Sequence, residues 1–444
     1  MADTERLTAL LDDFFGILNN DPGALDPTSA YYVPDLHGRG AEDVVELLAR
    51  TLRSTQGSGL YYFSGQRGTG KTTELRRLRT QLNGDARCRA VMVDALEYIG
   101  DSHPIELIDL LLVAAVAFAD HLEDELKQDF LAESVAQRFG TWLQSEVEIS
   151  GVSAFGVKVE FRKQQQSLLA RIRAFDLARK ERFIAECRDF LRDLGDVVRK
   201  RWRVQKVVLI VDSLERLRGV GNAADEMFDR VVQVFDGGLD SLRLPEMQVV
   251  YSVPPYLPYL SNVKARVPVY MLASVRVCEP PLRARRQPRA DGLDTMARLV
   301  EKRFARCREV LTRGAIDRLV LASGGDVRQL LRRLLLDAVN EAYYALDRLP
   351  ITAEDEIVAT VIDRHRIEFE QMVVREAYPL LAAIAERDTV DLPKRSDLPV
   401  AARFFDIRAV LNYRNGTDWV DLNPLLWKLI DGTAPPSPDA GVAR

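Results

Sequence analysis

Residues 65–72 read Gly65-Gln66-Arg67-Gly68-Thr69-Gly70-Lys71-Thr72 and match the pattern G-x-x-x-x-G-K-[ST] in full. In such a loop the glycines let backbone N–H groups close around a phosphate, and the start of the next helix adds positive partial charge. The lysine reaches the terminal phosphates, and the threonine hydroxyl binds Mg²⁺. The pattern predicts a phosphate-binding loop that comprises residues 65–72 and the adjoining Thr73.

The segments on either side of this loop supply the context that the pattern needs. Leu60-Tyr61-Tyr62-Phe63 precede it, and such a run of apolar and aromatic residues is typical of a buried strand. Leucines at helical spacing follow it, namely Leu75, Leu78 and Leu82. A strand, the loop and a helix in this order predict a nucleotide site, with ATP and Mg²⁺ as the expected ligands.

Four further segments are predicted as strands of the same sheet, at 89–94, 207–211, 247–253 and 269–275. The second of these is wholly apolar, as expected of a central parallel strand buried on both faces. Helical patterns alternate with the strands. The chain is therefore predicted to be an α/β protein with a doubly wound, parallel-sheet P-loop core.

The chain has 444 residues, which is too long for one compact core. Changes of pattern divide it into an N-terminal helical segment (1–32), an ATPase core (33–99 and 206–290), a mostly helical insertion (100–205), a helical lid (291–350), a winged-helix-like domain (351–431) and a disordered tail (432–444). Within the insertion, residues 146–149 and 157–161 alternate polar with apolar residues and predict a hairpin.

Composition indicates a soluble cytoplasmic protein. Hydrophobic residues make up 47% and charged residues 29%, with a net charge of −5, which argues against coating nucleic acid through bulk charge. The N-terminus carries acids where a signal peptide would carry basic residues. The most apolar helical stretch, 107–119, is interrupted by Asp109 and too short to span a bilayer, so we expect a buried helix. Four scattered cysteines indicate neither disulfides nor zinc: Cys88, Cys187, Cys278 and Cys307.

Acidic residues after the central apolar strand are candidates for catalysis. Asp212 ends that strand, where a Walker B aspartate would hold the Mg²⁺ hydration shell opposite Thr72. The alternative is a strand-end aspartate that caps a turn. The next residue is Ser213, and Glu215 is the best candidate to orient the attacking water, with a surface salt bridge as the alternative.

Three more polar residues are candidate nucleotide contacts. Ser252, at the end of the following strand, is placed to sense the γ-phosphate, although a serine is common at such an end. Arg266 precedes the last strand and is a candidate finger toward a neighbouring subunit's ATP, or else an ordinary surface arginine. Arg328 follows Gly324-Gly325-Asp326-Val327, a segment with a capping-box-like helix start that leaves Arg328 off the buried face.

These motifs, in this order, resemble origin-recognition-like AAA+ ATPases and STAND NTPases. The resemblance includes Leu36-His37-Gly38-Arg39, the loop at 65–72, the strand ending at Asp212, and the segment that contains Arg328. It implies that Gly38 and Arg39 lie near the adenine and that Arg328 acts as sensor 2. The long insertion and the serine at position 213 depart from the typical AAA+ pattern, so we expect slow ATP turnover.

The C-terminal region also resembles those families. Residues 409–422 predict a hairpin with a type I′ turn at Asn415-Gly416, similar to the wing of a winged-helix domain. Arginines and aspartates balance along it, so packing against the ATPase core is favoured over reading DNA. The most basic stretch contains four arginines in a loop flanked by prolines, Arg283, Arg285, Arg286 and Arg289. It is expected to be a solvated linker, with phosphate or acidic protein as alternative partners.

The resulting hypothesis is a nucleotide-dependent switch. The sequence shows no effector domain, so the resemblance to STAND proteins implies control of a separate effector or signalling protein, together with homo-oligomerisation and a link to bacterial conflict or anti-phage systems. Two alternatives stay open. One is a DNA-engaging AAA+ ATPase of initiator or transposition-regulator type, and the other is a nucleotide-binding scaffold without turnover.

Overall fold

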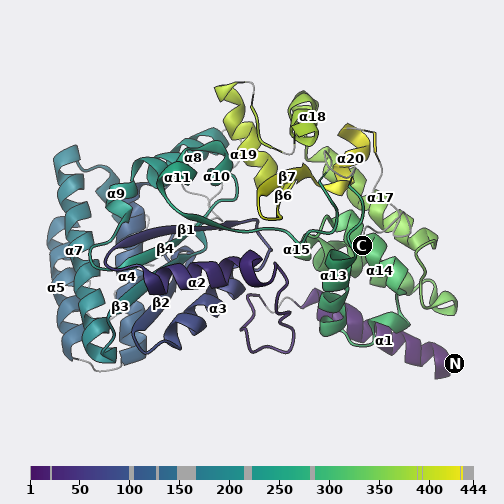
Figure 1. Cartoon of the computed structure of the whole chain (residues 1–444), viewed down its shortest axis with the longest axis horizontal. Coiled ribbons are helices and arrows are strands. Elements are labelled where there is room, and N and C mark those ends of the chain that lie inside the picture. The colour runs from purple at the N-terminus through teal and green to yellow at the C-terminus, as the bar shows by residue number, and fades with distance from the viewer. Residues whose placement is uncertain are drawn as a thin grey trace. The chain divides into compact units, whose positions relative to one another are not determined.

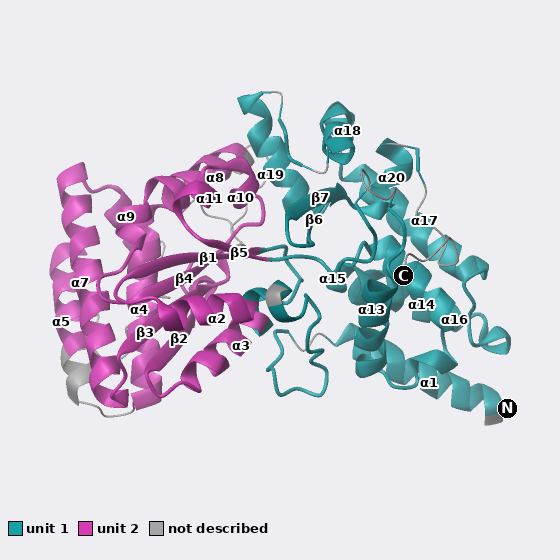
Figure 2. Ribbon diagram, viewed as in Figure 1, with its two compact units in different colours: residues 1–44, 65–73, 272–444 teal, residues 45–64, 74–271 magenta. Residues whose placement is uncertain are grey.

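The computed structural model describes residues 2–20, 23–99, 105–126, 130–147, 167–214, 223–280, 286–387, 389–392, 394–430 and 432–433. The chain divides into two compact units (Figure 2). Unit 1 comprises residues 1–44, 65–73 and 272–444, and unit 2 comprises residues 45–64 and 74–271. The phosphate-binding loop therefore groups with unit 1, although the strand before it lies almost wholly in unit 2.

Unit 2 is built on a five-stranded sheet in the order β2-β3-β4-β1-β5 (Figure 1). The pairings β1–β4, β2–β3 and β3–β4 are parallel. The predicted α/β core is confirmed, and four of the five predicted strands agree with the structure to within two residues. The strands are β1 (Gly59–Gly65), β2 (Cys88–Asp94), β3 (Lys206–Asp212), β4 (Gln248–Val253) and β5 (Val269–Leu272).

Two adjacent tyrosines of β1 show why helices cover both faces of this sheet. Successive side chains of a strand point to opposite faces. The Tyr61 hydroxyl donates to Thr55 Oγ1 (3.0 Å), just after helix α2 (Val44–Ser54). The Tyr62 hydroxyl donates to the Phe235 carbonyl (2.6 Å), on the turn that follows α8 (Ala223–Val232). The sheet is thus covered on both sides.

Helix α4 (Leu107–Leu126) is buried against β2, as its apolar sequence predicts. Asp109 is fully buried in its first turn. Burial raises the pKa of this carboxyl, whereas Arg173, 2.7 Å away, opposes the shift. Among the described residues, no helix is long and apolar enough to cross a membrane.

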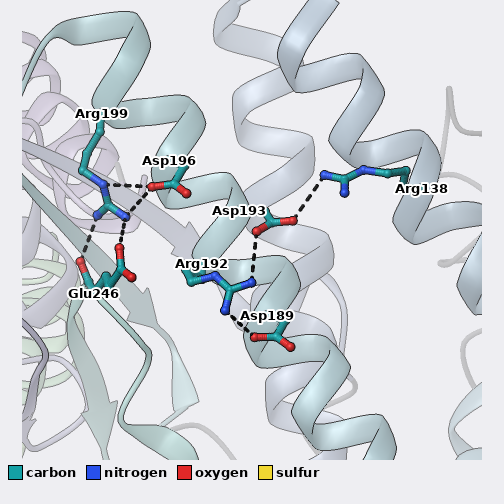
Figure 3. Close-up of polar contacts among 7 residues, drawn as sticks. All are labelled: Arg138, Asp189, Arg192, Asp193, Asp196, Arg199 and Glu246. Atoms are coloured by element: carbon teal, nitrogen blue, oxygen red, sulfur yellow. Dashed lines mark hydrogen bonds and ion pairs between the residues drawn. The ribbon is translucent and has the colours of Figure 1, made fainter.

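The other helices of the insertion are α5 (Phe130–Val147) and α7 (Leu177–Trp202). Ion pairs run along α7 and also reach Arg138 of α5 and Glu246 (Figure 3). The hairpin predicted in the insertion is wrong at Glu146 and Val147, because these residues end α5. Its remaining residues lie outside the described part of the chain. Unit 2 also contains α9 (Leu239–Leu242), α10 (Leu257–Leu260), α11 (Val263–Arg266) and all but the first three residues of α3 (Lys71–Asn83).

Unit 1 gathers the N-terminal helix with the helices that follow the sheet. Helix α1 (Ala2–Asn19) packs on α16 (Leu335–Ala342), and the Phe14 and Phe304 rings stack at 4.7 Å. Arg332 donates to the Asn19 carbonyl (2.7 Å) at the end of α1. The other helices are α13 (Ala290–Arg303), α14 (Arg313–Ser323), α15 (Val327–Gln329), α17 (Glu356–Gln371), α18 (Tyr378–Arg387), α19 (Leu398–Asp406) and α20 (Pro424–Ile430).

The predicted C-terminal hairpin is confirmed, with strands β6 (Val410–Arg414) and β7 (Asp418–Leu422) following helices α17 to α19. The predicted type I′ turn is wrong. Three residues form the loop, because Arg414 pairs with Asp418. Gly416 has φ +85°, whereas Asn415 does not have a positive φ. A three-residue loop needs only one left-handed residue, and glycine supplies it.

Candidate functional site

The loop at 65–73 has the shape expected of a phosphate cradle. Gly68 and Gly70 have φ values of +93° and +92°, which residues with a side chain rarely adopt. A Cβ on Gly65 would lie 2.6 Å from the Leu272 carbonyl oxygen, so a side chain there would clash with backbone. Helix α3 begins at Lys71 and directs its first N–H groups toward the loop. These features fit a bound phosphate chain.

Lys71 is almost fully buried, and its Nζ donates to the carbonyl of Gln66 (2.7 Å). The Thr69 hydroxyl donates to the same carbonyl (2.8 Å). The ammonium group thus bonds to the backbone of its own loop. Thr73 accepts a hydrogen bond from the Leu25 N–H (3.0 Å), and Thr72 is half-buried at the start of α3.

The lid segment that carries Arg328 lies directly against this loop. A Cβ on Gly68 would be 2.6 Å from Arg328 Cβ and 3.0 Å from Arg328 Cδ. The Arg328 side chain is exposed and makes no hydrogen bond or ion pair with the described residues. Its guanidinium group is therefore available beside the glycine-rich loop.

The predicted capping box of the lid is half formed. Asp326 Oδ1 accepts the Gln329 N–H (2.9 Å), as an N-cap should. The Gln329 side chain does not return the contact to Asp326, because its Oε1 accepts from Asn423 Nδ2 (2.9 Å). Asn423, from the C-terminal region, thus helps to fix the helix start that carries Arg328.

Residues 272–275 join four parts of unit 1. Leu272 faces Gly65, and the Ala273 carbonyl lies 2.8 Å from His37 Nδ1. The Ser274 N–H donates to the Asn412 carbonyl (3.0 Å), and the Val275 N–H donates to the Gly325 carbonyl (3.3 Å). These contacts explain why the predicted strand 269–275 ends at Leu272. The following residues bond to the N-terminal segment, hairpin and lid instead of the sheet.

The segment predicted to lie near the adenine adjoins the loop through His37. The imidazole Nε2 is the nearest atom to a Cβ on Gly70, at 4.0 Å. Gly38 has φ +127°, and a Cβ there would lie 2.9 Å from Glu42 Cβ. Arg39 is exposed and pairs with Asp35 (3.0 Å). The sequence pattern does not predict that His37 lies beside the phosphate-binding loop. The only sequence signal for it is its position directly before Gly38.

The hairpin contacts the loop through Gln66, which is fully buried. Its Nε2 donates to the Val410 carbonyl of β6. The Tyr413 hydroxyl donates to the Gly324 carbonyl of the lid (2.7 Å), and burial raises the pKa of this phenol, so it retains its proton. Arg408 pairs with Asp326 (3.2 Å). Nothing in the local sequence pattern indicates these contacts.

The arginine loop before the lid differs from the predicted solvated linker. Arg286 is buried and forks onto both carboxyl oxygens of Asp421 in β7, at 2.8 Å each. Its guanidinium also lies 4.3 Å from the centre of the Trp427 ring. Arg289 pairs with Glu279 and Asp291. The expectation of a solvated linker is therefore wrong for Arg286, while Arg283 and Arg285 lie outside the described residues.

Unit 2 carries the other predicted catalytic residues. Asp212 is buried at the carboxyl end of β3, two strands from β1 in the sheet. Ser213 adopts φ +73°, an uncommon conformation for a residue with a side chain. The Leu214 N–H donates to Ser252 Oγ (3.0 Å), so Ser252 supports the turn after the aspartate. Its predicted sensor role remains a prediction.

Arg266 and Glu215 are the other two predicted catalytic residues of this region. Arg266 Nη1 contacts the Asp236 carboxyl (3.0 Å) and is half-exposed. This ion pair lies within unit 2, and the finger role stays a prediction. Glu215 lies outside the described residues.

Comparison with solved structures finds loose likenesses to proteins of similar length. The Aeropyrum pernix ORC2 protein, in its ADPNP-ADP complexes, is 12% identical with a TM-score of 0.39, and the match covers 92% of this chain and 97% of that one. Cdc6p from Pyrobaculum aerophilum is 12% identical with a TM-score of 0.33, covering 92% and 98%. The Thermotoga maritima RuvB Holliday junction branch migration motor is 12% identical with a TM-score of 0.35, covering 89% and 96%.

Comparison with sequence families shows which family the chain belongs to. No curated protein matches the chain. Residues 7–230, half of its length, match the AAA ATPase domain, and this match confirms the predicted P-loop ATPase of the AAA+ class. The chain belongs to the AAA ATPase domain family.

Proposed function

We propose that this protein is an ATP-dependent molecular switch in which the lid reports the γ-phosphate through Arg328. The observation that carries the proposal is the position of Arg328, which lies against Gly68 with its guanidinium unpaired among the described residues. A guanidinium makes strong, charge-assisted bonds to phosphate. ATP offers a γ-phosphate to it, whereas ADP does not, so the two nucleotides hold the lid differently.

Lys71 supplies the cation for the β- and γ-phosphates. The ammonium group has three N–H donors, so it can bond to phosphate while it still donates to the Gln66 carbonyl. Thr72 and Asp212 are the residues that the sequence motifs assign to Mg²⁺, which neutralises phosphate charge when it is bound. The glycine backbone and the start of α3 provide fixed donors, and these need no reorganisation as phosphate enters.

Hydrolysis is proposed to be slow and to reset the switch. Ser213 stands where many AAA+ proteins carry a glutamate, so Glu215 is the proposed residue for orienting water. A nucleotide-binding scaffold without turnover remains the alternative. A phosphate-release assay separates the two. The separate effector protein, self-assembly and a role in bacterial conflict or anti-phage systems rest on family resemblance alone.

The DNA-engaging alternative receives less support. Its candidate contact was the arginine loop, but Arg286 and Arg289 are paired with carboxylates. Asp421, the hairpin aspartate that pairs with Arg286, is itself buried. Phosphates of DNA would have to displace these intramolecular ion pairs. The pairs therefore disfavour DNA binding by the arginine loop.

Isothermal calorimetry with ATP and Mg²⁺ tests the nucleotide site. Lys71→Ala removes the buried ammonium group and should lower the affinity by at least about a hundredfold, because charge-assisted bonds to phosphate are lost. Lys200→Ala, which removes an exposed lysine near the end of α7, is the matched control and should bind as the wild type does. An unchanged affinity for Lys71→Ala would contradict the proposed site.

A further inference from the structure

The chain turns where it leaves β3, and Ser213 makes that turn. Ser213 directly follows Asp212, the last residue of the strand, and has φ +73°. A residue with a side chain rarely adopts this left-handed conformation, because it costs free energy and persists only where the surrounding structure imposes it. Such positions often lie at functional sites. Here the strained residue follows the aspartate that the sequence assigns to Mg²⁺.

The Ser213 hydroxyl is fully buried, and its Oγ has no hydrogen-bond partner among the described residues. A hydroxyl can donate one hydrogen bond and accept two. Burying it without any of them is costly, and an alanine in the same place would avoid the cost. A ligand that offers a hydrogen bond to this oxygen would recover the loss.

The end of the neighbouring strand β2 shows another role for a strand-end aspartate. Asp94 is the partner of Asp212 in the register of the two parallel strands. Its Oδ1 accepts the N–H of Leu96, two residues further on, at 2.9 Å, so Asp94 caps the turn after its own strand. This is the alternative that the sequence left open for Asp212.

The turn after β3 is capped differently. The matching N–H, that of Leu214, donates to Ser252 Oγ in the adjacent strand β4 at 3.0 Å, and the Asp212 carboxyl group does not accept it. Ser252 thus does for this turn what Asp94 does for the other. Asp212 and Ser213 occupy consecutive buried positions, and neither side chain caps the turn through this N–H.

A carboxylate followed by a hydroxyl suits a hydrated Mg²⁺ ion. Mg²⁺ gives up its waters reluctantly, so proteins usually hold it through one or two carboxylates, the phosphates of the substrate and several retained waters. Those waters donate hydrogen bonds, and they need acceptors around the ion. A serine hydroxyl can accept one without adding a second buried negative charge beside the carboxylate.

We propose that Ser213 binds the hydration shell of the nucleotide-bound Mg²⁺ together with Asp212, by accepting a hydrogen bond from a metal-bound water. This inference rests on the proposed function, because it requires ATP and Mg²⁺ in the site. It gives Ser213 a role of its own at the position where many AAA+ proteins carry a glutamate. The serine binds water on the metal, while orienting the attacking water is left to Glu215.

The test compares two buried serines whose hydroxyls both lack a hydrogen-bond partner among the described residues. Ser213→Ala removes the hydroxyl and keeps the Cβ. Ser274→Ala is the matched control, because Ser274 lies in unit 1, is 5% exposed and contacts the hairpin through its backbone N–H, which the substitution retains. Ser213→Gly is a second variant, which removes the hydroxyl and also relieves the left-handed backbone.

The first measurement is ATP affinity by calorimetry, once with Mg²⁺ and once with EDTA. The ratio of the two affinities reports what the metal contributes. In Ser213→Ala and Ser213→Gly this ratio should fall about three- to tenfold, the effect of one hydrogen bond, with the affinity in EDTA unchanged. In Ser274→Ala the ratio should equal that of the wild type.

The second measurement is thermal unfolding without nucleotide or metal, which a purely structural role would affect in the opposite direction. Ser213→Ala should be at least as stable as the wild type, because it removes a buried hydroxyl that has no partner among the described residues. Ser213→Gly should melt about 2–4 °C higher, because glycine adopts the left-handed conformation without strain.

Each contrary outcome has a distinct meaning. If the wild type binds no ATP under either condition, the proposed function fails and this inference falls with it. If the wild type shows a Mg²⁺-dependent affinity and Ser213→Ala keeps the same ratio, only the role of Ser213 is overturned. An equal fall of the ratio in Ser274→Ala would also overturn it, because the effect would not be specific to Ser213. Lower melting temperatures of both Ser213 variants with unchanged ratios would assign the hydroxyl a structural role instead.

Discussion

Arginine–carboxylate contacts occur in both units, but they are made in different ways. In unit 2, Arg192 of α7 contacts Asp189 at 2.7 Å and Asp193 at 3.4 Å (Figure 3). Asp189 is 55% exposed, and these partners lie within three residues of Arg192. In unit 1, Arg286 contacts Asp421, which is 135 residues away, and both side chains are less than 10% exposed.

This difference indicates which ion pairs stabilise the conformation of the protein. Exposed pairs within one helix gain little, because water screens them and they restrain side chains that the helix already positions. A buried pair between distant segments is costly to break, since either charge left alone has no solvent. The contacts of Gln66 and Tyr413 also join distant segments in buried surroundings, although they are hydrogen bonds between uncharged groups.

The largest effect is expected from Arg286→Ala. It leaves Asp421 buried without its charged partner and removes the contact with Trp427, which should lower the local free energy of unfolding by about 3–5 kcal/mol. Cys278 offers a probe nearby, because burial raises the pKa of its thiol to about 12 and keeps it protonated. Thiol labelling followed by mass spectrometry should find Cys278 unreactive at pH 8 in the wild type and reactive in Arg286→Ala. Equal, slow labelling in both proteins would contradict the importance of the pair.

The smallest effect is expected from Arg192→Ala. This substitution removes one exposed and one partly buried contact on α7, and it should lower the stability of the insertion by less than about 1 kcal/mol. Hydrogen exchange along α7 measures the change in unit 2. A loss as large as that from Arg286→Ala would mean that burial does not separate the two groups of contacts.

Much of unit 2, and the phosphate-binding loop of unit 1, could be predicted from sequence because their signals are local. The apolar run before Asp212 specifies a buried central strand, and the glycines and lysine at 65–72 specify a phosphate cradle. The same reasoning could not place Gln66 or Arg286. Gln66 is a polar residue in a loop, and Arg286 is an arginine between prolines, so the local sequence predicts that both are solvated. Their partners lie 344 and 135 residues away along the chain. Tertiary contacts of this range leave no periodicity in the sequence.

The central claim is that ATP, and not ADP, holds the lid on the phosphate-binding loop through Arg328. A bidentate bond from this guanidinium to the γ-phosphate should favour the closed arrangement by about 1.5–3 kcal/mol, roughly a ten- to hundredfold shift in population. Small-angle scattering of the wild type and Arg328→Ala, each with saturating ATP or ADP, measures it directly. We predict ATP-specific compaction in the wild type and none in Arg328→Ala, with ADP binding intact in both. If Arg328→Ala compacts with ATP as the wild type does, the sensor role of Arg328 is contradicted.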